Sequence, residues 1–209
     1  FATVTALVGI DRQQNNISPL GPVRAGLAFG SYWEGGERLV GFRDISLEQI
    51  MPVGRDRTFR LKGLVREQTA RNLNLLDSTL YDVFGSYDRK LGNGDALQLS
   101  IGASHLSAGA ENSYDEYEVG IGYGLARPIL GVQLYTSLQF GYRTYDEFVT
   151  PLDGRDDHFI SAAATATFQD VSYFGFSPSV TVSSSRTVST AEENTTSAVQ
   201  VLFGVTSNF

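Results

Sequence analysis

The segment Arg155-Asp156-Asp157-His158 offers the clearest candidates in this sequence for acid–base chemistry or metal binding. Adjacent side chains of an extended chain point to opposite faces, so only Asp156 with His158, or Arg155 with Asp157, can act together. One aspartate–histidine pair is a weak ligand set for a metal ion. The other histidine, His105, has serines nearby in sequence, but the preceding serine faces the other side of an extended strand and no third group orients a base. We therefore expect neither a catalytic site nor a metal site.

Other signatures of chemistry are missing from the sequence. It contains no GxSxG, HExxH, Walker or dinucleotide-binding motif. It has no cysteine, which excludes a catalytic thiol, a Cys-ligated metal and a disulfide scaffold. The glycines at positions 120, 122 and 124 share one strand face, where we expect them to leave interior space or to let the strand curve. With a net charge of −7, the chain also lacks the basic character of a nucleic-acid binder, so we predict no enzyme, no cofactor and no nucleic-acid partner.

A basic stripe, formed by Arg60, Lys62 and Arg66, shares one face of an expected strand. These charges could line an interior and pair with acids of the preceding strand, such as Asp44 and Glu48. They could instead guide an anionic or polypeptide cargo. The spacing is compatible with both interpretations.

Alternation of apolar and polar residues along the whole chain predicts the elements that position these side chains. In one segment Val132, Leu134 and Leu138 alternate with Gln133 and Gln139. Strands of roughly 10 to 15 residues exceed the globular norm of about 5 or 6 and suit the roughly 9 to 11 that cross a bilayer. The polar face, rich in Gly, Ser, Thr and Gln, suits a wet interior, so we predict an all-β, antiparallel up-and-down transmembrane barrel. The expected strands lie near 2–11, 23–34, 37–51, 57–69, 77–89, 95–107, 114–126, 131–145, 156–168, 171–185 and 196–209.

The connections and the number of strands extend this prediction. Most connections alternate between short and long, as in outer-membrane barrels. The first part of the chain breaks the rule, because 12–22 is long where a short turn is due and 35–36 is short where a long loop is due. Single-chain bacterial barrels have an even number of strands, whereas eleven is odd. We therefore expect an N-terminal truncation, with at least one strand upstream of Phe1.

Aromatic residues near the expected strand ends suit an interfacial girdle between lipid and water. They are Tyr32, Trp33, Tyr114, Tyr117, Tyr142, Tyr145, Phe148, Tyr173 and Phe174. At the C-terminus, Phe203, Val205 and Phe209 share one face of an alternating strand. This ending resembles the signal that directs bacterial outer-membrane barrels to the barrel-assembly machinery.

Four marks in the C-terminal two-thirds of the chain stand at a characteristic spacing. They are a Tyr-Asp hairpin start, an Arg-Asp-Asp strand start, a Gly-x-x-Pro strand and a terminal Phe, formed by Tyr145, Asp146, Arg155, Asp156, Asp157, Gly175, Pro178 and Phe209. Together they resemble the surface lipoprotein assembly modifiers of Gram-negative bacteria. The segment 184–194 departs from the pattern of that family around its last outer loop, which affects any role of this loop in cargo recognition.

The resemblance implies a barrel of about fourteen strands in the bacterial outer membrane, of which about eleven lie in this sequence. It also implies a periplasmic helical-repeat domain upstream, which this sequence does not contain. The implied function is assistance in the translocation or display of lipoproteins on the cell surface, with outer-membrane lipid, lipoprotein cargo and the barrel-assembly machinery as partners. The residues by themselves leave two alternatives open, a porin or passive solute channel and a soluble β-barrel that binds a small ligand.

Overall fold

The computed structural model describes residues 3–18, 20–34, 37–70, 77–108, 113–145, 154–171 and 176–207. Within these ranges the chain is all-β, with eleven strands in one sheet and two single-turn 3-10 helices, η2 (Gln169–Val171) and η3 (Glu192–Asn194). No helix in this part of the chain is long and apolar enough to cross a membrane. The strands are β1 (Thr3–Ser18), β2 (Gly21–Glu34), β3 (Glu37–Pro52), β4 (Arg57–Ala70), β5 (Ser78–Lys90), β6 (Ala96–Ala108), β7 (Tyr114–Gly124), β8 (Val132–Tyr145), β9 (Asp156–Phe168), β10 (Phe176–Ser189) and β11 (Thr196–Ser207).

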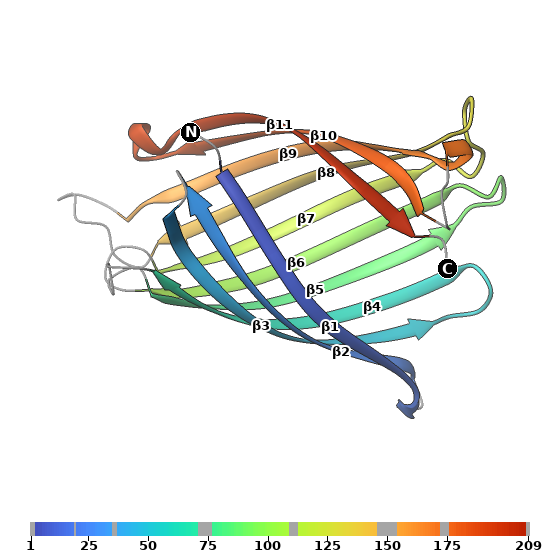
Figure 1. Ribbon diagram of the computed structural model, residues 1–209, viewed down its shortest axis with the longest axis horizontal. Coiled ribbons are helices and arrows are strands. Elements are labelled where there is room, and N and C mark those ends of the chain that lie inside the picture. Colours follow the sequence, from blue (N-terminus) through green and yellow to red (C-terminus); the bar gives the residue numbers. More distant parts are fainter. Residues whose placement is uncertain are drawn as a thin grey trace.

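Each strand pairs with its neighbours in the chain, so the sheet runs from β1 to β11 without a crossover. All ten ladders are antiparallel. Figure 1 shows the sheet rolled around an interior, and β1 and β11 form its two edges. Among the described residues no ladder joins these two edges. The predicted all-β, antiparallel, up-and-down arrangement of eleven strands is therefore confirmed.

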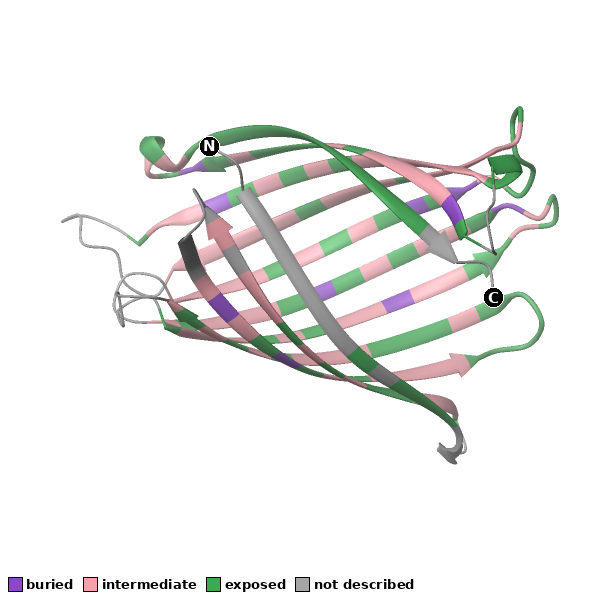
Figure 2. Ribbon diagram, viewed as in Figure 1, coloured by how far each residue is buried: buried purple, intermediate pink, exposed green. Residues whose placement is uncertain are grey.

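The two faces of the sheet carry opposite chemistry. On β7, Tyr117, Val119 and Ile121 are exposed, whereas Glu118 and Gly120 between them are more covered. Figure 2 shows the same alternation of exposed and less exposed residues along most of the strands. Side chains spread apart on the outside of a rolled sheet and crowd together on the inside. Most of the large apolar residues therefore lie on the convex face, and most of the polar residues between them lie on the concave face.

Polar side chains, rather than an apolar core, form the most enclosed part of the molecule. No apolar side chain is buried in the described ranges, and the two least exposed residues there are Asp157 and Ser177. Soluble globular proteins bury Ile, Val, Leu and Phe and keep aspartate at the surface. This sheet has the opposite arrangement.

The first strand is longer than the sequence pattern predicts. The expected strand ends at residue 11, but β1 continues to Ser18, and Arg12 and Gln14 pair with Ala25 and Val23 of β2. Polar residues interrupt the alternation here while the backbone ladder continues, and this is why the pattern fails to show the strand. The expected long loop 12–22 was wrong. The short turn found there fits the alternation of connection lengths, but the equally short connection between β2 and β3 still breaks it.

The tenth strand lies closer to the C-terminus than predicted, at Phe176–Ser189 instead of 171–185. Its second half is rich in serine and threonine and has a weak apolar period. Backbone pairing with β9 nevertheless continues through the pair of Ser189 with Asp157.

Candidate functional site

The basic stripe lies on the concave face of β4, where two of its three side chains contact acids. Arg66 donates two hydrogen bonds of 2.7 Å to the carboxylate of Asp44 on β3. This pairing is the one expected if the stripe lines an interior. Arg60 Nε lies 3.5 Å from Asp88 Oδ2 on β5, so its partner comes from the following strand and not from the preceding one.

The third member of the stripe, Lys62, lies in register with Glu48 on β3. Two further carboxylates, Asp82 on β5 and Glu118 on β7, face the same interior from neighbouring strands. The Glu118 side chain lies against Gly102 of β6, where an added Cβ would meet it at 2.8 Å. Lys62, Asp82 and Glu118 together give this part of the concave wall a net negative charge.

An arginine–aromatic group stands on the concave face at the end of the sheet where β7 begins and β8 ends. Arg143 of β8 donates to Glu116 of β7, with 2.7 Å between Nε and Oε2. Its guanidinium carbon lies 4.4 Å from the centre of the Tyr114 ring and 5.9 Å from that of Phe159. Charge-assisted hydrogen bonds and cation–π contacts hold this guanidinium against the wall.

A second arginine extends this group across β8 and β9. Arg155 donates two hydrogen bonds, of 3.0 and 2.7 Å, to Asp157, and its guanidinium carbon lies 4.2 Å from the centre of the Tyr145 ring. Tyr145 in turn meets Tyr114 edge-on, with 5.5 Å between ring centres. The structure thus brings Tyr145, Arg155 and Asp157, which belong to two of the four sequence marks, into one contact network. We call Tyr114, Glu116, Arg143, Tyr145, Arg155, Asp157 and Phe159 the rim cluster.

Asp156, the remaining residue of the Arg-Asp-Asp mark, points to the opposite, convex face. There it accepts a hydrogen bond of 2.7 Å from the Tyr142 hydroxyl. The Tyr142 and His158 rings lie 5.0 Å apart on this face. As the period of two predicts, Asp156 and His158 are therefore separated from Arg155 and Asp157.

The expected aromatic girdle is only partly on the convex face. Tyr117 and Tyr142 lie there, but Tyr114 and Tyr145 belong to the concave rim cluster, so their assignment to the girdle was wrong. Successive side chains of a strand point to opposite faces, and Tyr114 and Tyr145 each lie three residues from the convex-facing tyrosine of the same strand. Phe148, Tyr173, Phe174 and the side chain of Tyr32 lie outside the described part of the chain.

The convex face carries other aromatic residues that we did not single out from the sequence. Phe59 and Tyr87 pack at 4.8 Å near one end of the sheet, and Tyr81 lies 6.4 Å from His105 near the other. His105 Nδ1 also lies 2.8 Å from a carboxylate oxygen of Asp115. Each of these residues lies an even number of positions from an apolar residue of the same strand, and this spacing could have identified them in the sequence.

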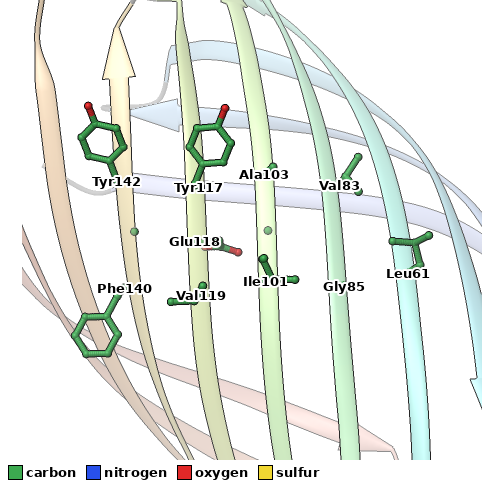
Figure 3. A pocket seen from close by; sticks show the side chains of 12 residues that line it. Leu61, Val83, Gly85, Ile101, Ala103, Tyr117, Glu118, Val119, Phe140 and Tyr142 are labelled. Atoms are coloured by element: carbon green, nitrogen blue, oxygen red, sulfur yellow. The ribbon is translucent and has the colours of Figure 1, made fainter.

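Between these aromatic groups the convex face is apolar and slightly hollowed. Figure 3 shows the hollow, a shallow depression of about 510 Å³ across β4 to β8. Leu61, Ile101 and Phe140 line it, and Gly85 contributes no side chain where its neighbours carry bulky ones. These large apolar side chains are exposed on the outer surface of the sheet, and Ile101 is 65% exposed.

The concave glycines receive the side chains of neighbouring strands. A Cβ on Gly122 would collide with Tyr135, and one on Gly141 would collide with the Phe159 ring. Tyr135 also donates a hydrogen bond of 2.8 Å to Gln98 of β6. The space expected at the glycines of β7 is therefore filled by side chains that lie flat against the wall.

At the other end of the sheet, Asp95 links two turns. Its carboxylate accepts hydrogen bonds from the backbone N–H of Ala126 at 2.7 Å, from the Tyr123 hydroxyl and from the Asn93 side chain at 2.6 Å. The Ala126 N–H, followed by the Tyr123 hydroxyl, holds the pKa of Asp95 below its ordinary value, against the opposing effect of burial. Asp95 therefore joins the β5–β6 turn to the start of the β7–β8 turn as a charged acceptor.

The last two strands place the remaining predicted residues. Pro178 pairs with Val205, and Phe203 pairs with Val180. Phe203 and Val205 are 82% and 68% exposed, so both present apolar surface on the convex face. Asp146, Gly175 and Phe209 lie outside the described residues.

Within the described ranges no three His, Asp or Glu side chains come close enough to hold a metal ion. Many polar groups of the concave wall form ion pairs and hydrogen bonds with one another, most of them between strands. Comparisons of the chain with protein-family models, with curated proteins and with solved structures found no match.

Proposed function

We propose that this chain forms part of the wall of a transmembrane β-barrel in the bacterial outer membrane. The observation that carries the proposal is the reversed polarity of the sheet, whose large apolar side chains cover the convex face while charged pairs line the concave face. In a bilayer, lipid would contact the convex face and water would fill the interior. A soluble ligand-binding barrel would need the opposite arrangement.

The dimensions of the convex face support the same proposal. Tyr81 and Tyr87 stand at its two ends on one strand, six residues apart, which corresponds to about 20 Å along a strand. Apolar residues such as Val83 lie between them. Outer-membrane barrels have an apolar band about 25 Å tall between two aromatic girdles, and their strands are tilted by about 40°, so this stretch covers about 15 Å of height and fits within such a band.

For this barrel we propose a role in the translocation or display of lipoproteins at the cell surface. The support is the resemblance of the four marks in the C-terminal two-thirds to surface lipoprotein assembly modifiers. Residues of two of these marks, Tyr145 with Arg155 and Asp157, meet in the rim cluster. A passive solute channel is the second candidate, and the hydrophilic, charge-paired concave wall favours it. No bond chemistry is required for either function.

The position in the membrane can be tested by cysteine labelling, because residues 1–209 contain no cysteine and any cysteine elsewhere in the gene product would first be replaced by serine. Ile101→Cys and Ser100→Cys would be made in the full-length gene product and probed in isolated outer membranes. We expect a water-soluble maleimide to label the Ser100 variant and a lipid-phase probe to label the Ile101 variant. Ile160→Cys and Ser161→Cys on β9 form a matched second pair. Equal labelling of both members of each pair would refute a membrane wall.

The lipoprotein role needs a separate experiment. The full-length protein would be co-expressed with a candidate lipoprotein, and surface-exposed lipoprotein would be quantified with an antibody on intact cells. We expect exposure to be lost without the barrel protein. Exposure that does not depend on the protein, together with a steady wide conductance in planar bilayers, would reject this role in favour of the solute channel.

A further inference from the structure

The hollow on the convex face lies between two rows of side chains that run across the strands. In the first row Ala103 of β6 pairs with Tyr117 of β7, which pairs with Tyr142 of β8. In the second row Gly85 of β5 pairs with Ile101 of β6. Gly85 and Ala103 both line the hollow, where they leave space between bulkier neighbours (Figure 3). Its volume of about 510 Å³ lies within the range of about 300 to 1,000 Å³ of small-molecule sites.

A row of polar side chains follows on the convex face, toward the end of the sheet where β8 ends. It contains His105 of β6, Asp115 of β7 and Asp156 of β9. The side chains of His105 and Asp115 are 45% and 41% exposed, so this pair is open to a ligand. Figure 3 shows the hydroxyls of Tyr117 and Tyr142 pointing from the edge of the hollow toward this row. The Tyr142 hydroxyl donates to Asp156, whereas that of Tyr117 has no hydrogen-bond partner in the described part of the chain.

The polar row carries acceptors but no permanent cation. Between β5 and β9, neither the row of Tyr117 nor the row of Asp115 contains a lysine or an arginine. The arginines nearest to them in the chain, Arg143 and Arg155, belong to the concave rim cluster. A lipid phosphate would therefore stand beside carboxylates with no positive side chain to neutralise it. The Asp115 carboxylate and the Tyr117 hydroxyl suit an uncharged group that offers an N–H donor and a carbonyl acceptor.

In a bilayer the hollow alone cannot select its ligand. Lipid tails are as apolar as the side chains that line the hollow, so transfer of an acyl chain from the bilayer brings no hydrophobic gain. Only the fit of the chain and the hydrogen bonds of the polar row can distinguish one acylated molecule from another.

We infer that the hollow and the polar row bind the acylated N-terminal cysteine of a lipoprotein cargo. One acyl chain lies in the hollow, the amide N–H of the anchor donates to Asp115, and an ester carbonyl accepts from the Tyr117 hydroxyl. Such an anchor joins its acyl chains to the polypeptide through ester, thioether and amide groups and carries no phosphate. Phospholipids and lipid A carry phosphate close to their acyl groups. This inference rests on the proposed role in lipoprotein display.

The place of the polar row along the strands agrees with an anchor at the cell surface. The longest interval between consecutive strands separates Tyr145, where β8 ends, from Asp156, where β9 begins. It lies at the same end of the sheet as the polar row. Outer-membrane barrels carry their longer loops on the outside, so this end would lie in the outer leaflet, where the anchor of a displayed lipoprotein resides.

Photo-cross-linking in bilayers can test this inference with the full-length protein. A synthetic diacylated lipopeptide with a diazirine in one acyl chain would be added to nanodiscs of phosphatidylethanolamine and phosphatidylglycerol, and the adducts would be mapped by mass spectrometry. Phosphatidylethanolamine with the same diazirine chain is the matched control probe. We expect lipopeptide adducts at the hollow that unlabelled lipopeptide displaces, and phospholipid adducts spread over the convex face. The same distribution for both probes would overturn the inference.

Three variants separate the hollow from the polar row. Gly85→Leu combined with Ala103→Leu fills the hollow and should reduce the lipopeptide adducts there by at least about tenfold. A Cβ at Gly85 meets Ile101 at an ordinary contact distance of 3.6 Å, so the exchange is compatible with the fold. Ala162→Leu, in a second hollow across β7 to β10, is the matched control and should leave the adducts unchanged. Tyr117→Phe removes the hydroxyl donor and should weaken lipopeptide binding about fivefold.

Unchanged adducts in both the filled variant and Tyr117→Phe would overturn the inference. Its failure can be told apart from failure of the proposed function. If Ile101→Cys is labelled from the lipid phase and lipoprotein display on cells is intact, a lack of lipopeptide adducts at the hollow overturns the inference alone. If neither labelling nor display is found, the proposed function fails and the inference fails with it.

Discussion

Removing the carboxylate of Asp157 tests the energetic role of the rim cluster. Asp157 is 1% exposed and receives both hydrogen bonds of the Arg155 guanidinium, which is itself 16% exposed. Asp157→Ala leaves that guanidinium largely enclosed with only the Tyr145 ring beside it. The variant should therefore be much less stable than the wild-type protein.

The size of the effect follows from the burial of the pair. Removing one partner of a buried ion pair costs about 3 to 5 kcal/mol, whereas exposed pairs contribute about 0 to 1 kcal/mol. Because Arg155 keeps some exposure, water can reach it, and we expect the lower end, about 3 kcal/mol. That loss is about a hundredfold in the unfolding equilibrium and shifts a urea midpoint by about 1 M or more.

The assay is urea unfolding of the full-length protein in lipid vesicles, with wild type and variant compared under the same conditions. Glu67→Ala is the matched control, because it also removes one carboxylate from an arginine–carboxylate pair. This pair is exposed, since the side chains of Arg43 and Glu67 are 63% and 55% exposed. Replacing both partners, as Arg155→Met with Asp157→Leu, should recover most of the lost stability because no charge is then left enclosed. If Asp157→Ala costs no more than Glu67→Ala, the rim cluster does not stabilise the wall and the reasoning fails.

Three further predictions concern the turns, the glycines and the interior. Folding lowers the pKa of Asp95, so its ionised carboxylate stabilises the fold fully above the ordinary carboxyl pKa, and this contribution is lost as the pH falls through the lowered pKa. Between about pH 5 and pH 2, the urea midpoint of Asp95→Asn should therefore change less than that of wild type. An equal change in the two proteins would contradict this prediction. Gly141→Val should destabilise the protein by about 1 to 3 kcal/mol through collision with a neighbouring ring, whereas Gly63→Val, where a Cβ meets nothing, should be close to neutral in the same urea assay. Lys62→Glu should raise the ratio of cation to anion permeability in planar bilayers, because it makes the concave wall more negative. Arg43→Glu, on the convex face, should leave this ratio unchanged. Equal reversal potentials for the two variants would refute an interior position of Lys62.

The fold could be predicted because one face of each strand is apolar. Pairs such as Ile101 and Ser100 repeat along the chain, and this repeat gives the number of strands and most of their bounds. It failed where backbone pairing continues without apolar side chains, as at Gln14 in β1 and Ser189 in β10. Hydrogen bonding between backbones does not depend on side-chain type, so such extensions leave little trace in the sequence.

Side-chain partners were harder to predict than strands. The pairing of Arg66 with Asp44 could be predicted because β3 and β4 are adjacent in the chain. Arg60 instead pairs with Asp88, on the following strand β5. A residue in the middle of a sheet has two neighbouring strands, and only the register of both decides between them. The rim cluster was predicted only in part. The period of two places Arg155 and Asp157 on one face, but Arg143 is joined to its aromatic neighbours by cross-strand geometry that the linear sequence does not display.

In the described part of the chain, each strand forms backbone ladders with its predecessor and its successor, so the sheet is a series of repeated hairpins. Duplicating or deleting one hairpin would change the girth of the molecule while every remaining ladder kept its register. Evolution could therefore resize such a structure in steps of two strands, and an engineer could do the same by grafting hairpins at any of its connecting turns.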